Sequence, residues 1–152
     1  MKSATRLIAL LGLVSTAFAA SPFAGTWKLN LASSMSTGNG APPKDQMLVI
    51  EEVGDQIKVA LTGTAGNGSP IVNKFTVPAA GGAATLQESP FNAISAKFVA
   101  PNIADLSYMV GGKEVSTQHS LVSGDGKTLW LVTRTTTPQG SVIEGIAAFD
   151  RR

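Results

Sequence analysis

The stretch SPFAGTWKLNLASS, residues 21–34, carries the clearest local signal in the sequence. It contains Trp27, one of two tryptophans, directly after Gly25-Thr26 and at the start of the first run that favours a β-strand. Aromatic residues make up 6% of the chain, so a tryptophan at this point indicates a specific structural role. The residues before and after the stretch show which role that is.

Residues 1–20, MKSATRLIALLGLVSTAFAA, have the layout of a cleavable signal peptide. Lys2 and Arg6 make the start basic, an apolar run follows, and small residues stand at the end. The apolar run is shorter than the roughly 20 residues that a transmembrane helix needs. A membrane anchor that is retained is the alternative interpretation.

The end of this segment offers two cleavage sites, AFA at 17–19 and FAA at 18–20. We therefore expect a mature chain that begins at Ala20 or Ser21 and is exported to the periplasm or the extracellular medium. Residues 21–152 are then one domain, long enough to bury a core.

Charge and cysteine content exclude several partners. Removal of Lys2 and Arg6 lowers the 12 basic residues to 10, equal to the 10 acidic residues. A neutral mature domain gives no reason to expect a nucleic acid or an anionic membrane as partner. The chain has no cysteine, so neither a disulfide nor a lipid-modified cysteine is available.

Turn signals recur at short intervals and predict an all-β, antiparallel, up-and-down barrel of about eight to ten strands. The glycine-rich turns include VGD, GNGSP, VGG, SGDGK and TPQGS. Closure into a barrel removes the exposed edges of so many strands, and a flattened sandwich is the alternative. Residues 33–43 and 78–90 are expected to be loops. The expected strands are Thr26–Leu31, Gln46–Glu52, Ile57–Thr62, Ile71–Val77, Ala93–Ala100, Ile103–Val110, Val115–Val122, Thr128–Thr136 and Val142–Phe149.

Alternation along these runs suggests which side chains face the barrel interior. The more apolar phases place Phe75, Phe98, Tyr108 and His119 inside, and these four are the candidate ligand-binding residues. A structural role is the alternative for each: a lone histidine beside apolar residues is commonly a core or surface residue, and aromatic side chains commonly fill a core.

The sequence FAGTWKLN resembles the G-x-W start of lipocalins and the F-x-GTWKL start of fatty-acid-binding proteins, both calycin-type barrels. Together with PPK, IEEVGDQIKV, DGKTLWLVTR and the final FDRR, it is similar to small secreted lipocalin-like bacterial proteins. The resemblance implies that Trp27 closes one end of the barrel after a turn at Gly25. It also implies that Arg134, on a late strand, lies across the indole ring.

The resemblance ends at the last strand. Fatty-acid-binding proteins carry Arg-x-Tyr there, which clamps the ligand carboxylate, whereas this chain has Ala147-Ala148-Phe149. A buried carboxylate without partners is costly, so the resemblance implies a neutral or weakly polar ligand.

The sequence offers few candidate residues for catalysis. One histidine and no cysteine are too few for a typical zinc site, and no G-x-S-x-G motif accompanies the histidine. Glu51 and Glu52 are neighbours on a strand and point to opposite faces. We therefore expect no enzyme activity, no metal and no cofactor.

Two functions remain. The first is an exported carrier or scavenger of a small hydrophobic molecule held in the barrel lumen. The alternative is a protein-interaction barrel, such as an exported inhibitor or envelope component, without a small-molecule ligand. An open apolar lumen would favour the carrier, and a filled barrel with an exposed apolar patch would favour the interaction module. The oligomeric state is left open.

Overall fold

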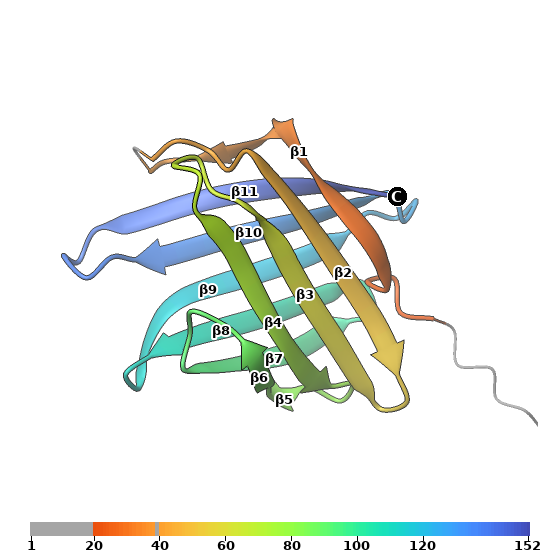
Figure 1. The fold of residues 1–152 in the computed structure, drawn as a ribbon. Helices are drawn as coiled ribbons and strands as arrows, with labels where there is room; N and C mark the ends of the chain where they lie inside the picture. Colours follow the sequence, from red (N-terminus) through yellow and green to blue (C-terminus); the bar gives the residue numbers. More distant parts are fainter. Residues whose placement is uncertain (1–19, 39) are drawn as a thin grey trace, which may run out of the picture.

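In the computed structural model, which describes residues 20–38 and 40–152, eleven antiparallel strands form a single sheet (Figure 1). The predicted signal peptide lies outside the described residues except for Ala20. No helix of the described part is long and apolar enough to cross a bilayer. The strands are β1 Gly25–Ser36, β2 Asp45–Val53, β3 Gln56–Thr64, β4 Pro70–Pro78, β5 Gly82–Ala83, β6 Thr85–Glu88, β7 Ala93–Ala100, β8 Ile103–Val110, β9 Lys113–Val122, β10 Thr128–Thr136 and β11 Val142–Arg151.

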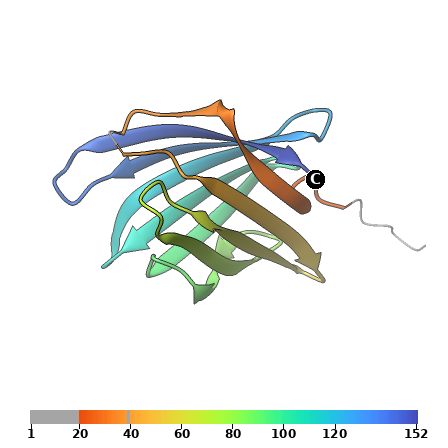
Figure 2. The ribbon, with the colours of Figure 1, turned by 45° about the horizontal axis from the view of Figure 1, so that its top comes forward.

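The architecture is the predicted all-β, up-and-down, nearly closed barrel (Figure 2). The number of strands differs from the expected eight to ten, because β5 and β6 lie in the stretch 78–90 that was expected to be a loop. β1 also extends to Ser36, beyond the predicted start of a loop at residue 33. Both additions come from Ala-, Gly- and Ser-rich sequence, whose low β-propensity is overridden by pairing with a neighbouring strand.

Two different junctions close the barrel. At the first, β1 pairs with both β2 and β11, so the start and the end of the described chain share one ladder. At the second, β4 and β7 do not pair with each other, and the segment Gly82–Glu88 bridges them. Its first half pairs with β7, Gly82 opposite Ala96, and its second half pairs with β4, Leu86 opposite Phe75. We call this second junction the seam.

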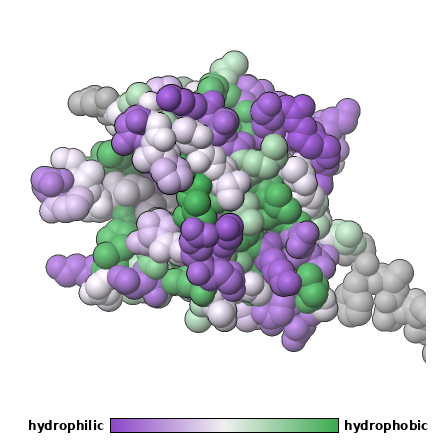
Figure 3. Space-filling view, viewed as in Figure 1, coloured by the Kyte–Doolittle hydropathy of each residue, from purple (hydrophilic) through white to green (hydrophobic). Residues whose placement is uncertain are grey.

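Alternating side chains build the core inside the barrel. On most of the long strands one phase is more buried than the other, whereas on β11 the neighbours Ala148 and Phe149 are both buried. Figure 3 shows polar and apolar side chains interspersed on one outer face of the molecule. The largest fully buried side chains are Trp27, Phe149, Ile94, Leu129, Val77 and Val122.

Candidate functional site

One end of the barrel is closed around Trp27, which is fully buried. The indole Nε1 donates a hydrogen bond to the carbonyl of Phe23 at 2.9 Å. The guanidinium carbon of Arg151 lies 4.0 Å from the ring centroid. The Arg151 nitrogens donate to the carbonyls of Pro22, Ala24 and Gly126, each at 2.6 Å. This cation therefore ties the entry of β1, the β9–β10 turn and the end of β11 together.

The prediction that Arg134 supplies this cation is wrong. Arg151 stands directly opposite Trp27 in the β1–β11 ladder. Arg134 is exposed, because on β10 the buried phase is that of Leu129 and Leu131.

At the closed end of the barrel, the position of Gly25 requires a residue without a side chain. Its φ of +143° is one that side-chain-bearing residues rarely adopt, and a Cβ there would overlap the Arg151 guanidinium. The sequence assigned Gly25 to a turn into the barrel, and the structure adds the close approach of Arg151 as the reason for glycine.

The barrel lumen contains a cavity of about 70 Å³. Phe75, Phe98 and Tyr108 line it, as their alternation predicts. Phe23 contributes from the closed end and meets Phe98 edge-to-face, with the ring centroids 6.4 Å apart. None of the described residues that line this cavity is charged, and its other apolar residues are Leu48, Ile50, Ile57, Val59, Leu61, Val77, Ala96, Ala104, Leu106, Leu129 and Leu131.

Uncharged polar groups form a strip on the cavity wall. The Tyr108 hydroxyl donates to Gln118 Oε1 at 3.2 Å, and Gln118 Nε2 donates to Ser120 Oγ at 2.9 Å. Burial raises the pKa of the Tyr108 phenol, so it stays a neutral donor. Asn73, 8% exposed, also lines the cavity, and its buried Oδ1 has no hydrogen-bond partner in the part of the chain that the structure describes. The lumen thus offers an unused acceptor in apolar surroundings.

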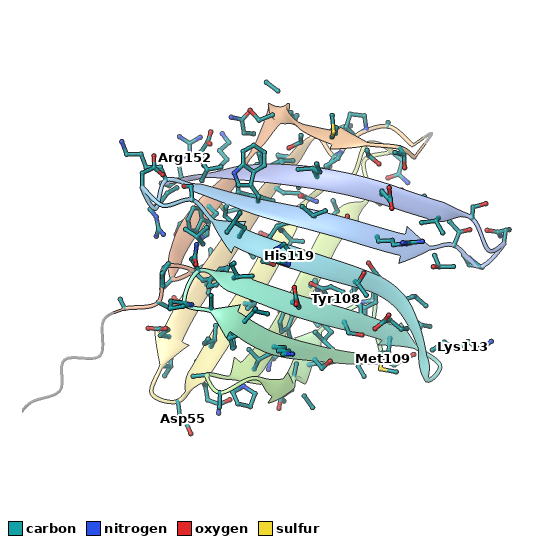
Figure 4. All side chains as sticks on the ribbon, turned by 180° about the vertical axis from the view of Figure 1, so that it is seen from behind. Asp55, Tyr108, Met109, Lys113, His119 and Arg152 are labelled. Atoms are coloured by element: carbon teal, nitrogen blue, oxygen red, sulfur yellow. The ribbon has the colours of Figure 1, made fainter. Side chains whose placement is uncertain are left out.

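His119 lies outside the lumen, which corrects the prediction for β9. The phase that faces inward is Ser116, Gln118, Ser120 and Val122. Figure 4 shows His119 on β9 beside the strand that carries Tyr108. His119 Nδ1 lies 2.6 Å from Asp105 Oδ1, with both side chains about half exposed. Sequence reasoning missed three polar lining residues for two reasons. Asn73 belongs to the phase of Ile71, Phe75 and Val77 that was assigned to the interior, but as a polar residue it was not named a candidate. Gln118 and Ser120 lie in the β9 phase that was assigned to solvent, where Val122 was the one available signal.

A larger groove of about 890 Å³ lies on the outer face of β7–β11, beside the end of β1. Most of its lining side chains belong to the phase opposite the core, including Lys97, His119, Val132 and Arg134. Val132 is 43% exposed and Met35, at one edge of the groove, is 69% exposed. Within the described residues no three potential metal ligands cluster, here or elsewhere.

No family model and no curated protein matches the sequence. Solved structures do match the fold. The zebrafish ileal bile acid-binding protein complexed with cholic acid is similar over 87% of this chain and 100% of its own, with a TM-score of 0.52 and 15% identity. The fold is that of the calycin-type barrels.

Two further solved structures match with lower TM-scores. Lobster apocrustacyanin A1 matches 86% of this chain and 61% of its own, with a TM-score of 0.44 and 15% identity. A redesigned β-barrel, mFAP1, bound to DFHBI, matches 86% of this chain and 95% of its own, with a TM-score of 0.41 and 14% identity. At these identities the likeness concerns the fold.

Proposed function

We propose that this calycin-type barrel is an exported binding protein that holds a small, neutral, predominantly apolar molecule in its lumen. The observation that carries the proposal is the cavity wall, which combines apolar side chains, no charge and an unpartnered acceptor at Asn73. Binding sites for small molecules have this composition: mostly apolar surface with a few polar groups that fix orientation. The bile acid-binding protein, of similar fold, was crystallised with cholic acid, which supports the proposal as an analogy of fold.

The same wall supports a ligand with a hydroxyl or N–H donor. A buried acceptor without a partner is costly, and a donor on the ligand removes that cost. A carboxylate would find no cation among the lining residues. The Tyr108–Gln118–Ser120 strip adds a second place where a polar ligand atom could be accommodated.

The cavity volume restricts the size of the ligand. About 70 Å³ is less than the roughly 150 Å³ of an engineered apolar cavity that binds benzene. A larger ligand therefore requires the barrel to widen. The seam is the place for this, because within the described residues a short ladder, Gly82 with Ala96 and Ala83 with Ser95, and the bond from the Ala84 N–H to the Ile94 carbonyl join the bridging segment to β7.

The test is a calorimetric titration with retinoid-like, sterol-like and long-chain alcohols against fatty acids of matched length. We expect the alcohols to bind more tightly. Asn73→Leu should weaken alcohol binding about five-fold, the equivalent of about 1 kcal/mol for one hydrogen bond. His119→Ala, on the outer face, is the matched control and should leave binding unchanged. If no probe binds, or if fatty acids bind most tightly and lose affinity in salt, the lumen proposal fails.

A second candidate function is protein recognition through the outer groove. Its volume of about 890 Å³ and the exposure of Val132 and Met35 favour it. It becomes the better explanation if the lumen binds no probe and Val132→Asp abolishes capture of a partner by the intact protein.

A further inference from the structure

The peptide nitrogen of Ser21 faces a carboxylate. It lies 3.2 Å from Glu52 Oε1 and 3.2 Å from Glu52 Oε2, near the end of β2. The Ser21 hydroxyl accepts from the N–H of Phe23, and the Ser21 carbonyl accepts from the N–H of Ala24. Ser21 therefore has a fixed position in the fold, whereas Ala20 before it is exposed.

The segment Ser21–Ala24, which we call the N-terminal plug, is held from the opposite side by Arg151. That guanidinium donates to the carbonyls of Pro22 and Ala24. Between these two anchors Phe23 is 5% exposed, lines the lumen cavity and accepts the indole N–H of Trp27. Among the described residues, Glu52 and Arg151 are the charged side chains that hydrogen-bond to the plug.

The single peptide N–H of Ser21 does not supply a separate hydrogen bond to each oxygen of the Glu52 carboxylate. An amide has one N–H to share between two acceptor oxygens, whereas an α-ammonium group has three N–H donors and a positive charge. The position of Glu52 therefore suits a free amino terminus better than an internal peptide bond. An amino terminus at Ala20 would be one residue further away, about 3.8 Å along the backbone.

We infer that the mature chain begins at Ser21 and that Glu52 is the receptor for its new α-ammonium group. The inference rests on the proposed export. A signal peptidase would hydrolyse the Ala20–Ser21 bond: the C–N bond breaks, hydroxide from water adds to the Ala20 carbonyl carbon, and the Ser21 nitrogen leaves as an amine that takes up a proton. Of the two cleavage sites that the sequence offers, the geometry selects the second. Processing thereby creates an ion pair between the Ser21 α-ammonium group and Glu52, and this ion pair holds Phe23 of the N-terminal plug at the end of the lumen.

The first experiment expresses the full chain with its leader in a bacterium and determines the amino terminus of the exported protein. We expect Ser21. A start at Ala20, or at any other residue, contradicts the inference and leaves export intact. An uncleaved chain in the membrane fraction contradicts both. Neither result depends on the ligand titration.

The second experiment follows the α-amino group of the processed protein by NMR as the pH is raised. An unpaired α-amino group has a pKa of about 7.7–8.0, and an exposed carboxylate partner should raise it by about half a pH unit. Arg151, which contacts the next residue's carbonyl, acts in the opposite direction. Because the raised pKa belongs to the folded state, the stabilisation is complete below about pH 7.7 and is lost as the pH rises through the folded pKa.

Glu52→Gln should return the pKa of the α-amino group to its ordinary range. Glu51→Gln is the matched control, because Glu51 is the neighbouring carboxylate on the opposite face of β2, beside Lys58 of β3. We expect the control to keep the raised pKa. Equal values in Glu52→Gln and the unmodified protein would overturn the assignment of Glu52.

Discussion

At the scale of single residues, the closed end depends on how Trp27, Gly25 and Arg151 fit together. The indole is fully buried, the glycine leaves room for the guanidinium, and the guanidinium stacks on the ring. A cation over an aromatic face contributes about 0.5–2 kcal/mol, depending on burial. The stacking here occurs together with three charge-assisted hydrogen bonds, which are stronger than neutral ones.

Trp27→Ala should destabilise the protein by about 3–5 kcal/mol, the range for loss of a large buried aromatic side chain. The cavity left behind lies at the barrel end, where Phe23 and Arg151 would lose their shared partner. Denaturant titration of both proteins measures the difference. A change within about 0.5 kcal/mol, as for an ordinary surface substitution, would show that Trp27 does not close the barrel.

Arg151→Ala should cost about 1–3 kcal/mol, because it removes the stacking and hydrogen bonds from a charged donor. Arg134→Ala is the matched control, since Arg134 is exposed, and it should change stability by less than about 0.5 kcal/mol. Similar losses of unfolding free energy in the two variants would contradict a specific role of Arg151 in stabilising the closed end.

The role of Trp27 could be predicted from the sequence, but the identity of the cation could not. The prediction for Trp27 came from the resemblance of FAGTWKLN to the G-x-W start of calycin-type barrels, which implies that this tryptophan closes one end. Which arginine stands opposite depends on the register between β1 and β11, and no local pattern fixes the pairing of strands so far apart in the sequence.

At the scale of the strands, β9 shows why the alternation of apolar and polar residues gave a wrong prediction for His119. Val115, Thr117, His119 and Leu121 form the more apolar phase, yet the other phase is inside. The partners on β8 explain the choice: Tyr108 lies opposite Ser116, and Ala104 lies opposite Ser120. Small serines leave room for the tyrosine within the barrel. Side-chain volume across the ladder therefore outweighs the hydropathy of one strand.

The β9–β10 turn depends on Asp125. Hydrogen bonds from the Ser123 hydroxyl at 2.6 Å and the Lys127 N–H at 3.0 Å lower the pKa of its carboxyl group. A lowered folded pKa stabilises the protein above the unfolded value, about 3.9, and this stabilisation is lost as the pH falls through the folded pKa. Asp125→Asn should therefore lower the melting temperature at pH 7, and the difference should vanish in acid.

Asp55→Asn, in the β2–β3 turn (Figure 4), is the control for this prediction and should have the smaller effect. Thermal unfolding followed by circular dichroism from pH 7 to about pH 2 gives the comparison. A difference between Asp125→Asn and the unmodified protein that stays constant in acid would contradict the role of the carboxylate.

The seam can be tested with a pair of neighbouring glycines. Both Gly81 and Gly82 have positive φ, +85° and +119°, so alanine strains the backbone at either position. A Cβ at Gly81 would also lie 2.9 Å from the Ala96 carbonyl oxygen of β7, whereas Gly82 has open space. Gly81→Ala should therefore loosen the seam more. Hydrogen exchange of the Ala84 N–H, which bonds to the Ile94 carbonyl, measures this; equal exchange in the two variants would contradict it.

At the scale of the whole molecule, the barrel was predictable because its determinants are local. Tight turns fix most hairpins, and successive hairpins generate the sheet order without knowledge of distant contacts. β5 and β6 were not predictable: two and four residues long, they become strands by bridging β7 and β4 across the seam. The lumen positions of Phe75, Phe98 and Tyr108 follow from alternation, and Asn73 shares the phase of Phe75, whereas Gln118 lies in the phase of β9 that was assigned to solvent.

Ligand binding by the intact barrel should depend only weakly on salt. The cavity lining holds no charge, and salt screens charges rather than apolar contacts. The affinity for a long-chain alcohol should change less than two-fold between about 0.05 and 0.5 M sodium chloride, where the Debye length shortens from roughly 14 to 4 Å. A ten-fold loss would contradict binding by apolar contact in the lumen.

The pairing of β1 with β11 also has a consequence for biosynthesis. β1 leaves the ribosome early, but its partner on one side is the last strand of the described chain. The barrel cannot close before β11 has left the exit tunnel, because until then β1 lacks its partner in the first junction. Until then the edge of β1 that faces β11 is unpaired, and an unpaired strand edge is a place where other chains can pair.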